Sequence, residues 1–244
     1  MIKSTAIIIP FFNEASRILD GQYLKNLSRN IEADFIYVDD GSTDKTLSIL
    51  NEVSKITKAK VLHLKQNSGK GEAVRAGLIE ALFLGKYEVI GYLDADGAFP
   101  ASEVNAHVKK CHDVLKGTVI DIYIASRIKM SGKQIERSST RHYLSRLILT
   151  LIGFNVSNMP YDSQSGLKFL KNTEKLGLAV SKQFRTRWFF DLELMARLGF
   201  QNKDCTWEEP VDSWRDIAGS KLGFRSSLVI LKEVFVIMRI LAKS

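Results

Sequence analysis

Short apolar runs alternate with helix-like segments along the first half of the chain, and this alternation constrains the fold more than any other feature. We predict strands over residues 5–10, 35–38, 61–64, 89–93 and 121–125. Between these runs, the apolar spacing is helical over 44–54, 72–84 and 102–115. Strands and helices that alternate in this way form a mostly parallel sheet with helices on both faces. The predicted fold class is therefore α/β.

The second half of the chain is less regular. There we expect a basic helix-like segment, a polar loop over 161–166, a helix near 191–198 and an apolar C-terminal helix. No internal repeat or low-complexity linker divides the 244 residues, so we expect a single domain over 1–244. No uninterrupted apolar stretch approaches the roughly 18 residues that indicate a transmembrane helix.

Polar clusters follow four of the predicted strands. They are Asn13-Glu14, Asp39 to Ser42, Gln66 to Gly71, and Asp94 to Asp96. Ligands of parallel α/β sheets bind at the carboxyl ends of the strands, which share one edge. We therefore expect the four clusters to line one cleft.

Asp94 and Asp96 are separated by one residue directly after the apolar run 89–93. Two carboxylates at a strand end provide the hard oxygen ligands that Mg²⁺ or Mn²⁺ prefers when it carries a diphosphate. The alternative is an ordinary turn in which the aspartates accept backbone N–H groups. Adjacent Asp39 and Asp40 at another strand end indicate a base or ribose contact, because buried neighbouring carboxylates repel each other unless a ligand uses them.

Gly69-Lys70-Gly71 does not complete a known nucleotide loop. Val74 stands where the dinucleotide fingerprint needs its third glycine, and Leu64 stands at the first glycine of the P-loop pattern. The segment is then either a flexible turn or a helix N-terminus that receives an anion.

The composition is that of an ordered globular protein, with 45% hydrophobic and 25% charged residues and a net charge of +8. The positive charge is local: residues 127–150 hold six Lys or Arg against one Glu, and residues 215–244 hold six against two acids. This distribution favours a phosphate or a membrane surface as partner. No nucleic-acid-reading motif is present, so we expect no nucleic-acid partner.

Two basic features could bind a ligand or could be ordinary structural features. Arg137 and Arg141 share a helix face and could meet one phosphate, with Lys221 approaching from a Gly-Ser-Lys loop, or they could form a solvated face. The C-terminal helix carries a basic stripe made of Arg225, Lys232, Arg239 and Lys243 on an otherwise apolar surface. It is expected to lie on a membrane or against a membrane partner subunit, and the alternative is an ordinary core helix.

Taken in order, these motifs resemble glycosyltransferase family 2, the inverting sugar-nucleotide transferases with the GT-A fold. The matching segments of the first half are 10–14, 38–44, Asn67 with 69–71, and 93–98. The second half resembles the dolichyl-phosphate β-glucosyltransferases and related polyprenyl-phosphate sugar synthases at 125–127, 162–168, 187–193 and 214–222. The resemblance covers almost the entire chain.

The resemblance implies a GT-A nucleotide-sugar-binding fold in which 1–127 binds the donor and 128–244 binds the acceptor. It implies that Pro10, Glu14 and Asp40 hold the nucleoside. Asp94 and Asp96 would bind the metal and the diphosphate, and Lys70 and Arg127 would also bind the donor. The acceptor would meet Arg137, Arg141, Gln164 and Lys221. Mannosyl-phosphate synthases of this type have Gln at the position of Ala98, whereas the glucosyl branch has Ala there.

The expected reaction is transfer of a hexose, glucose from UDP-glucose, to a polyprenyl or dolichyl phosphate with Mg²⁺ or Mn²⁺. A hydroxyl acceptor would need a carboxylate base, for which Asp191 or Glu193 is the candidate. A phosphate acceptor is already anionic, so Asp191 would orient groups instead. The alternatives are a family 2 transferase of surface polysaccharide synthesis, a nucleotidyltransferase, and a non-catalytic nucleotide-sugar-binding subunit. The expected location is cytoplasmic, peripheral at the cytoplasmic membrane face.

Overall fold

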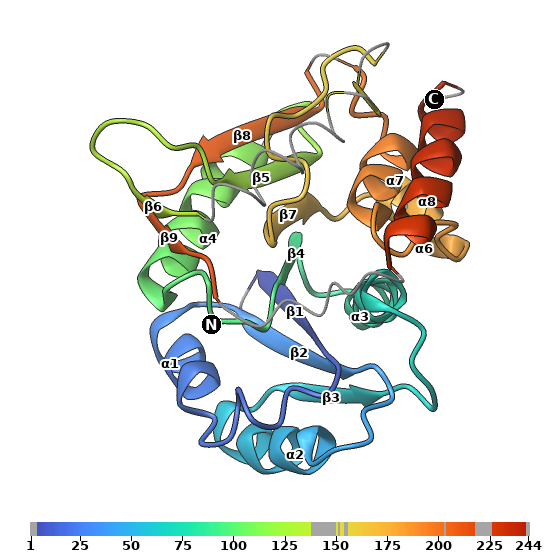
Figure 1. The fold of residues 1–244 in the computed structure, drawn as a ribbon. Helices are drawn as coiled ribbons and strands as arrows, with labels where there is room; N and C mark the ends of the chain where they lie inside the picture. Colours follow the sequence, from blue (N-terminus) through green and yellow to red (C-terminus); the bar gives the residue numbers. More distant parts are fainter. Residues whose placement is uncertain are drawn as a thin grey trace.

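The computed structural model describes residues 4–137, 150, 152–153, 156–202, 204–217 and 226–242, and of 226–231 it describes only the backbone. Arg141 and Lys221, two of the predicted acceptor residues, lie outside the described residues. So do Arg225 and Lys243 of the predicted basic stripe. The predicted α/β fold with a mostly parallel sheet is confirmed (Figure 1).

A seven-stranded sheet in the order β3-β2-β1-β4-β7-β5-β8 forms the centre of the molecule. Its strands are β1 (Thr5–Phe11), β2 (Asp34–Asp39), β3 (Lys60–His63), β4 (Val89–Leu93), β5 (Ile122–Ser126), β7 (Leu167–Lys171) and β8 (Thr206–Pro210). The first five match the predicted strands to within one residue at each end. β7 runs antiparallel to both of its neighbours, β4 and β5, and it was not predicted. A separate two-stranded sheet pairs β6 (Gln134–Glu136) with β9 (Ser213–Arg215).

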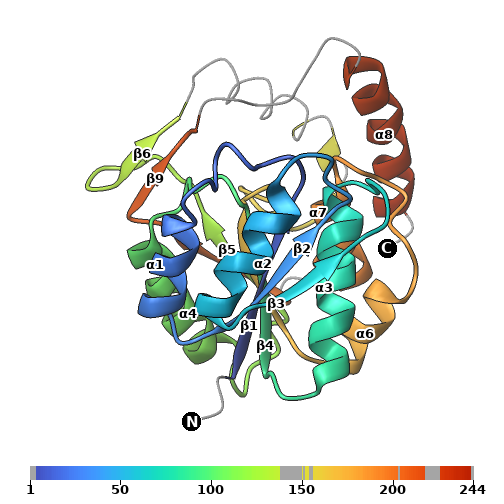
Figure 2. The same ribbon diagram turned by 90° about the horizontal axis from the view of Figure 1, so that it is seen from below.

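Helices cover both faces of the large sheet (Figure 2). One face is covered by α3 (Lys70–Leu84), α6 (Glu174–Ser181), α7 (Phe190–Arg197) and α8 (Ser226–Leu241). The other is covered by α1 (Gln22–Asn30), α2 (Thr46–Thr57) and α4 (Ala101–Leu115). Side chains alternate along a strand, so Ile8 of β1 packs toward α3 while Ile7 and Ile9 pack toward the opposite face. Gly77 lets α3 approach the sheet, because a Cβ there would lie 2.5 Å from Ile8.

The carboxyl ends of β1, β2 and β4 bring their loops to one edge of the sheet, opposite the N-terminus in Figure 2. Asn13, with a φ of 52°, turns the chain after β1, and its amide oxygen accepts the backbone N–H of Thr43 in the loop after β2. Because β7 is antiparallel, the 161–166 loop that precedes it reaches the same edge. Loops from the two halves of the chain therefore meet there.

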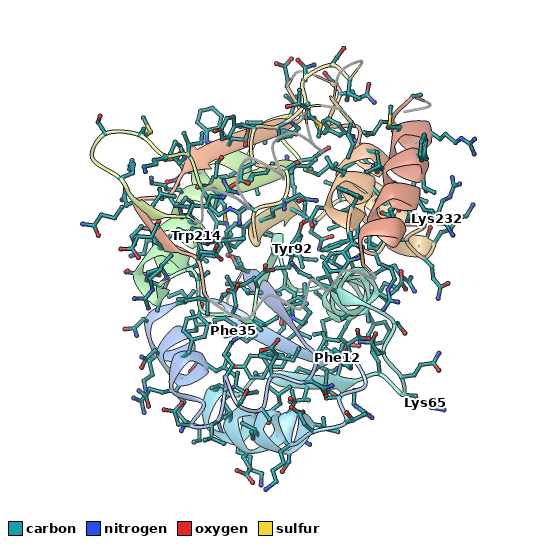
Figure 3. All side chains as sticks on the ribbon, viewed as in Figure 1. Phe12, Phe35, Lys65, Tyr92, Trp214 and Lys232 are labelled. Carbon is teal, nitrogen blue, oxygen red and sulfur yellow. The ribbon has the colours of Figure 1, made fainter. Side chains whose placement is uncertain are left out.

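The predicted C-terminal helix is confirmed as α8, which packs beside α7. Its inner face buries Glu233, Ile237 and Leu241. Its outer face exposes Phe235 and Met238 together with two members of the predicted basic stripe, Arg239 and Lys232. Figure 3 labels Lys232 on this face. In the part of the chain that the structure describes, no helix has the length and apolar character needed to cross a bilayer.

Candidate active site

Asp94 and Asp96 begin the loop after β4, facing the first turn of α3. The Lys70 ammonium group lies 2.6 Å from Oδ1 of Asp94, and Oδ1 of Asp96 accepts the backbone N–H of Ala98 at 3.0 Å. Burial and the neighbouring Asp94 carboxylate raise the pKa of Asp96. Burial lowers the pKa of Lys70, but the charges of Asp94 and Asp191 outweigh it and raise that pKa overall. Two carboxylates and one ammonium group thus form a compact charged cluster.

This cluster fits a divalent cation that shares its ligands with a substrate. The described residues contain no group of three or more His, Cys, Asp or Glu side chains arranged to hold a metal. Mg²⁺ is commonly held by one or two carboxylates, with substrate phosphates completing its octahedron. Asp94 and Asp96 supply that number of carboxylates, and the mutual repulsion that raises the pKa of Asp96 is what a cation between them would relieve.

Asp191 begins α7 and is buried directly behind this cluster. Its Oδ1 accepts hydrogen bonds from the Tyr92 hydroxyl of β4, labelled in Figure 3, and from Nζ of Lys168 at 2.7 Å. Lys168 lies in β7 and is fully buried. Sequence analysis missed Lys168, although a lysine inside the apolar run 167–170 is the signal that could have indicated it.

Glu193, the other candidate base, makes structural hydrogen bonds. Its carboxylate accepts the backbone N–H groups of Arg185 and Thr186 and pairs with Arg197 at 2.7 Å. These contacts hold the turn before α7 in place. Of the two predicted candidates, Asp191 is the one near the charged cluster.

Arg127 follows β5 and makes a two-pronged ion pair with Asp162. Nε of Arg127 lies 2.7 Å from Oδ2 of Asp162, and Nη2 lies 2.7 Å from Oδ1. Nη2 also donates to the backbone oxygen of Gln164, and the guanidinium lies 5.1 Å from the centroid of the Trp214 ring. Although Asp162 is buried, the Arg127 charge lowers its pKa to about 2.

Arg137 is the predicted acceptor residue that the structure places beside Arg127. Burial and the adjacent Arg127 charge lower the pKa of Arg137, while Asp162 and Asp216 oppose that effect. The indole Nε1 of Trp214, buried beside Arg127, has no hydrogen-bond partner among the described residues. The guanidinium groups of Arg127 and Arg137 and the indole N–H of Trp214, unpaired among the described residues, are the kind of donors that bind an anion.

Asp40 and Asp39, at the end of β2, have different surroundings. The Asp40 carboxylate accepts the backbone N–H groups of Ser68 and Gly69, both at 2.8 Å, and thus holds the loop before α3. Oδ2 of Asp39 lies 2.7 Å from Nδ1 of His63. Within the described residues, Oδ1 of Asp39 is buried without a hydrogen-bond partner. A spare acceptor therefore lies next to the predicted nucleoside residue.

The other predicted nucleoside residues belong to β1 and its loop. Pro10 is buried and lies opposite Val38 in the register of β1 with β2. Glu14 pairs with Arg17 at 2.6 Å, and its backbone N–H donates to the Thr46 hydroxyl. Both residues are near the end of the strand that leads to the shared edge.

A second unpredicted link joins α8 to the loop before α3. The buried carboxylate of Glu233 accepts the backbone N–H groups of Arg187 and Trp188 at 3.0 and 2.7 Å. The Arg187 guanidinium in turn donates to Oδ1 of Asn67 at 2.9 Å. The C-terminal helix is therefore fixed to the segment that contacts the loop held by Asp40.

Two solved glycosyltransferase structures superpose on this fold. The mannosyltransferase PcManGT from Pyrobaculum calidifontis, solved with GDP-Man and Mn²⁺, superposes with a TM-score of 0.62 at 18% identity, over 96% of this chain and 62% of its own. Glucosyl-3-phosphoglycerate synthase from Mycobacterium tuberculosis, solved with Mn²⁺, UDP-glucose and phosphoglyceric acid, superposes with a TM-score of 0.61 at 19% identity, over 97% and 80%. These likenesses establish the GT-A fold.

Sequence comparison gives the family. Residues 6–179 match the model of glycosyl transferase family 2, and the chain belongs to this family. The dolichyl-phosphate beta-glucosyltransferase of Saccharomyces cerevisiae is 29% identical over 253 residues, covering 96% of this chain and 73% of the yeast protein. The protein of the same name from Drosophila melanogaster is 31% identical over 250 residues, covering 95% and 73%.

Proposed function

We propose that this protein is an inverting hexosyltransferase that moves glucose from UDP-glucose to a polyprenyl or dolichyl phosphate. Relatives named dolichyl-phosphate beta-glucosyltransferase, similar over nearly the whole chain, support the acceptor class and the sugar. The structural observation that carries the proposal is the charged cluster after β4. There the Lys70 ammonium group lies 2.6 Å from Oδ1 of Asp94, and the Asp96 carboxylate lies in the same turn.

The donor diphosphate is the proposed ligand of this cluster. Asp94 and Asp96 would hold Mg²⁺ or Mn²⁺, which supplies Lewis-acid neutralisation of the leaving diphosphate when bound. Lys70 and Arg127 would stabilise the negative charge that develops on the same group. Asp39, with its spare oxygen, and the neighbouring Pro10, Glu14 and Asp40 are the proposed nucleoside end of the site.

The acceptor phosphate is proposed to bind beside Arg127 and Arg137, near Gln164. A phosphate monoester is already anionic near neutral pH, so it needs cations and alignment with the anomeric carbon rather than a base. The hydrogen bonds of Asp191 support a role other than general base, because Lys168 and Tyr92 already donate to its Oδ1. We propose that Asp191 orients the reacting groups. Arg141 and Lys221 remain proposed contacts of the same phosphate.

We also propose that the protein acts as a peripheral protein at the cytoplasmic face of a membrane, alone or with a membrane partner subunit. A polyprenyl chain stays in the bilayer, so its phosphate is presented at the interface. The outer face of α8 supports this location, because Lys232 and Arg239 can meet anionic headgroups beside the apolar side chains of Phe235 and Met238.

Transfer of labelled hexose tests the proposal. UDP- and GDP-hexoses would be incubated with polyprenyl phosphate and Mg²⁺ or Mn²⁺, with an EDTA control, and the label would be counted after organic extraction. Metal-dependent label from UDP-glucose in the lipid phase is the expected result. Label confined to water-soluble hydroxyl acceptors would contradict the lipid acceptor and make Asp191 a base. UDP binding without any transfer would indicate a non-catalytic subunit.

A further inference from the structure

A lysine buried in the centre of the sheet connects three parts of the candidate active site. Lys168 of β7 has a side chain with 1% exposure. Its Nζ donates to Oδ1 of Asp191 at 2.7 Å and to the backbone oxygen of Ser165 at 2.5 Å, and it lies 5.2 Å from the centroid of the Tyr92 ring. Burying an ammonium group is costly unless such partners compensate it, so its position is tightly defined.

Each partner of Lys168 belongs to a different element of the site. Asp191 begins α7, and Tyr92 lies in β4 two residues before Asp94. Ser165 belongs to the 161–166 loop, whose Asp162 side chain and Gln164 backbone oxygen hold Arg127. Displacing the ammonium group would therefore remove one hydrogen bond from Asp191 and one from the loop that holds Arg127.

Lys168 also contributes to which oxygen of the Asp191 carboxylate is held by the protein. Lys168 and Tyr92 both donate to Oδ1, and no described residue donates to Oδ2. Oδ1 is thus directed into the protein, and Oδ2 is the oxygen left to contact the sugar or the acceptor.

We propose that Lys168 is a positioning residue for glycosyl transfer, which fixes the orientation of Asp191 through its ammonium group. This inference rests on the proposed function, since it concerns the alignment of the same reaction. A buried ion pair can also be purely structural, and the two roles give different kinetic results.

A double-mutant cycle distinguishes the positioning role of Lys168 from a purely structural one. The steady-state kcat and the donor KM would be measured for Lys168→Met, Asp191→Asn and the double variant, with Lys168→Arg as the conservative variant. Lys168→Met is expected to lower kcat about 100-fold, a loss typical of misplaced reacting groups, with the donor KM little changed. Lys168→Arg keeps the cation and is expected to recover kcat to within about tenfold of the wild type.

The decisive comparison is the Asp191→Asn background. A residue that acts only through Asp191 has no further effect once that carboxylate is gone, so Lys168→Met is expected to leave the residual kcat unchanged there. The same fold loss in both backgrounds, or a Lys168→Met variant that transfers at the wild-type rate, would overturn the proposal. Lys171→Met is the matched control, because Lys171 lies on the same strand but donates to Thr118 at the opposite edge.

Thermal unfolding of the same variants gives a second, activity-independent result. The Lys168 and Asp191 substitutions are expected to be non-additive in their unfolding midpoints, and additive shifts would contradict the pairing. If Lys168→Met does not fold, Lys168→Gln, which also removes the positive charge, provides the same comparison in both backgrounds. A wild-type protein that binds UDP but transfers to no acceptor contradicts the proposed function, and the unfolding cycle still decides the pairing.

Discussion

Arg127 and Asp162 form a two-pronged ion pair in which Nε and Nη2 of the arginine reach the two carboxylate oxygens at 2.7 Å each. The backbone N–H of Arg127 also donates to Asp162 at 2.8 Å. Three donors on one buried carboxylate explain why its pKa is about 2 despite burial. The pair fixes the guanidinium at the end of β5.

The first prediction is an acid-sensitive stability contribution from Asp162. Its pKa is about 2 when folded against a reference of 3.8, so its ionised form stabilises the fold by about 2 kcal/mol above pH 4. That contribution is lost as the pH falls from about 4 to 2. Asp162→Asn is expected to be less stable than the wild type at pH 7, with the gap narrowing toward pH 2, in urea unfolding across that range. A gap independent of pH would contradict the assignment.

The second prediction concerns the metal. Asp94→Asn is expected to lower transfer about 100-fold or more, because the proposed cation at the donor diphosphate would lose a ligand. Titration calorimetry of UDP with Mn²⁺ is expected to show weakened binding in this variant. Asp113→Asn, on the far part of α4, serves as the control carboxylate and is expected to bind as the wild type does. Equal UDP affinity with Mn²⁺ and with EDTA would argue against a metal at Asp94.

The third prediction assigns Lys70 to the diphosphate. Lys70→Met is expected to weaken UDP binding tenfold to a hundredfold, roughly the value of one charge-assisted hydrogen bond. Uridine, which has no phosphate, is expected to bind both proteins equally. Parallel calorimetry with the two ligands measures the difference. An equal loss for uridine and UDP would show that Lys70 shapes the loop rather than binding phosphate.

The fourth prediction concerns Glu233. Glu233→Ala leaves the partly buried backbone N–H groups of Arg187 and Trp188 without their acceptor, which costs about 1 kcal/mol per group. Hydrogen exchange is expected to increase along α8 and at 187–188. The exposed pair of Glu80 with Lys60 provides the control, since Glu80→Ala is expected to cost at most about 1 kcal/mol. Similar effects of both variants in urea unfolding would contradict a role for Glu233 in holding α8.

The fifth prediction tests the outer face of α8. Replacing Lys232 and Arg239 with Glu is expected to abolish cosedimentation with anionic vesicles, because both cations face outward beside Phe235 and Met238. Leu178→Ser on α6 removes an apolar side chain that is 75% exposed and is expected to leave sedimentation unchanged. Vesicle binding that survives the charge reversal would place the membrane contact elsewhere.

The first five strands could be predicted because they are local apolar runs with clear ends, whereas helix α1 was not predicted. β7 could not, since the buried Lys168 interrupts its apolar pattern and its partners β4 and β5 are distant in sequence. The clustering of Lys70, Asp94 and Asp96 follows from the rule that parallel strands share a carboxyl edge.

The contacts between distant residues of the site could not be predicted from any local sequence pattern. Lys168 with Asp191, Asp162 with Arg127, and Glu233 with two backbone groups each join residues from separate elements, so no periodicity or short spacing indicates them.

Because β7 is inserted antiparallel between β4 and β5, it affects how the chain folds during synthesis and which fragments of it can fold. A fragment that ends at residue 127 keeps β4 and β5 but lacks β7, which pairs with both, and β8, which pairs with β5, so one edge of β4 and both edges of β5 would be left open. The middle of the sheet can close only after about 170 residues have been synthesised, because β7 ends at Lys171. The fragment 1–127 is therefore expected to aggregate when expressed alone and to become soluble when a fragment containing β7 and β8 is coexpressed.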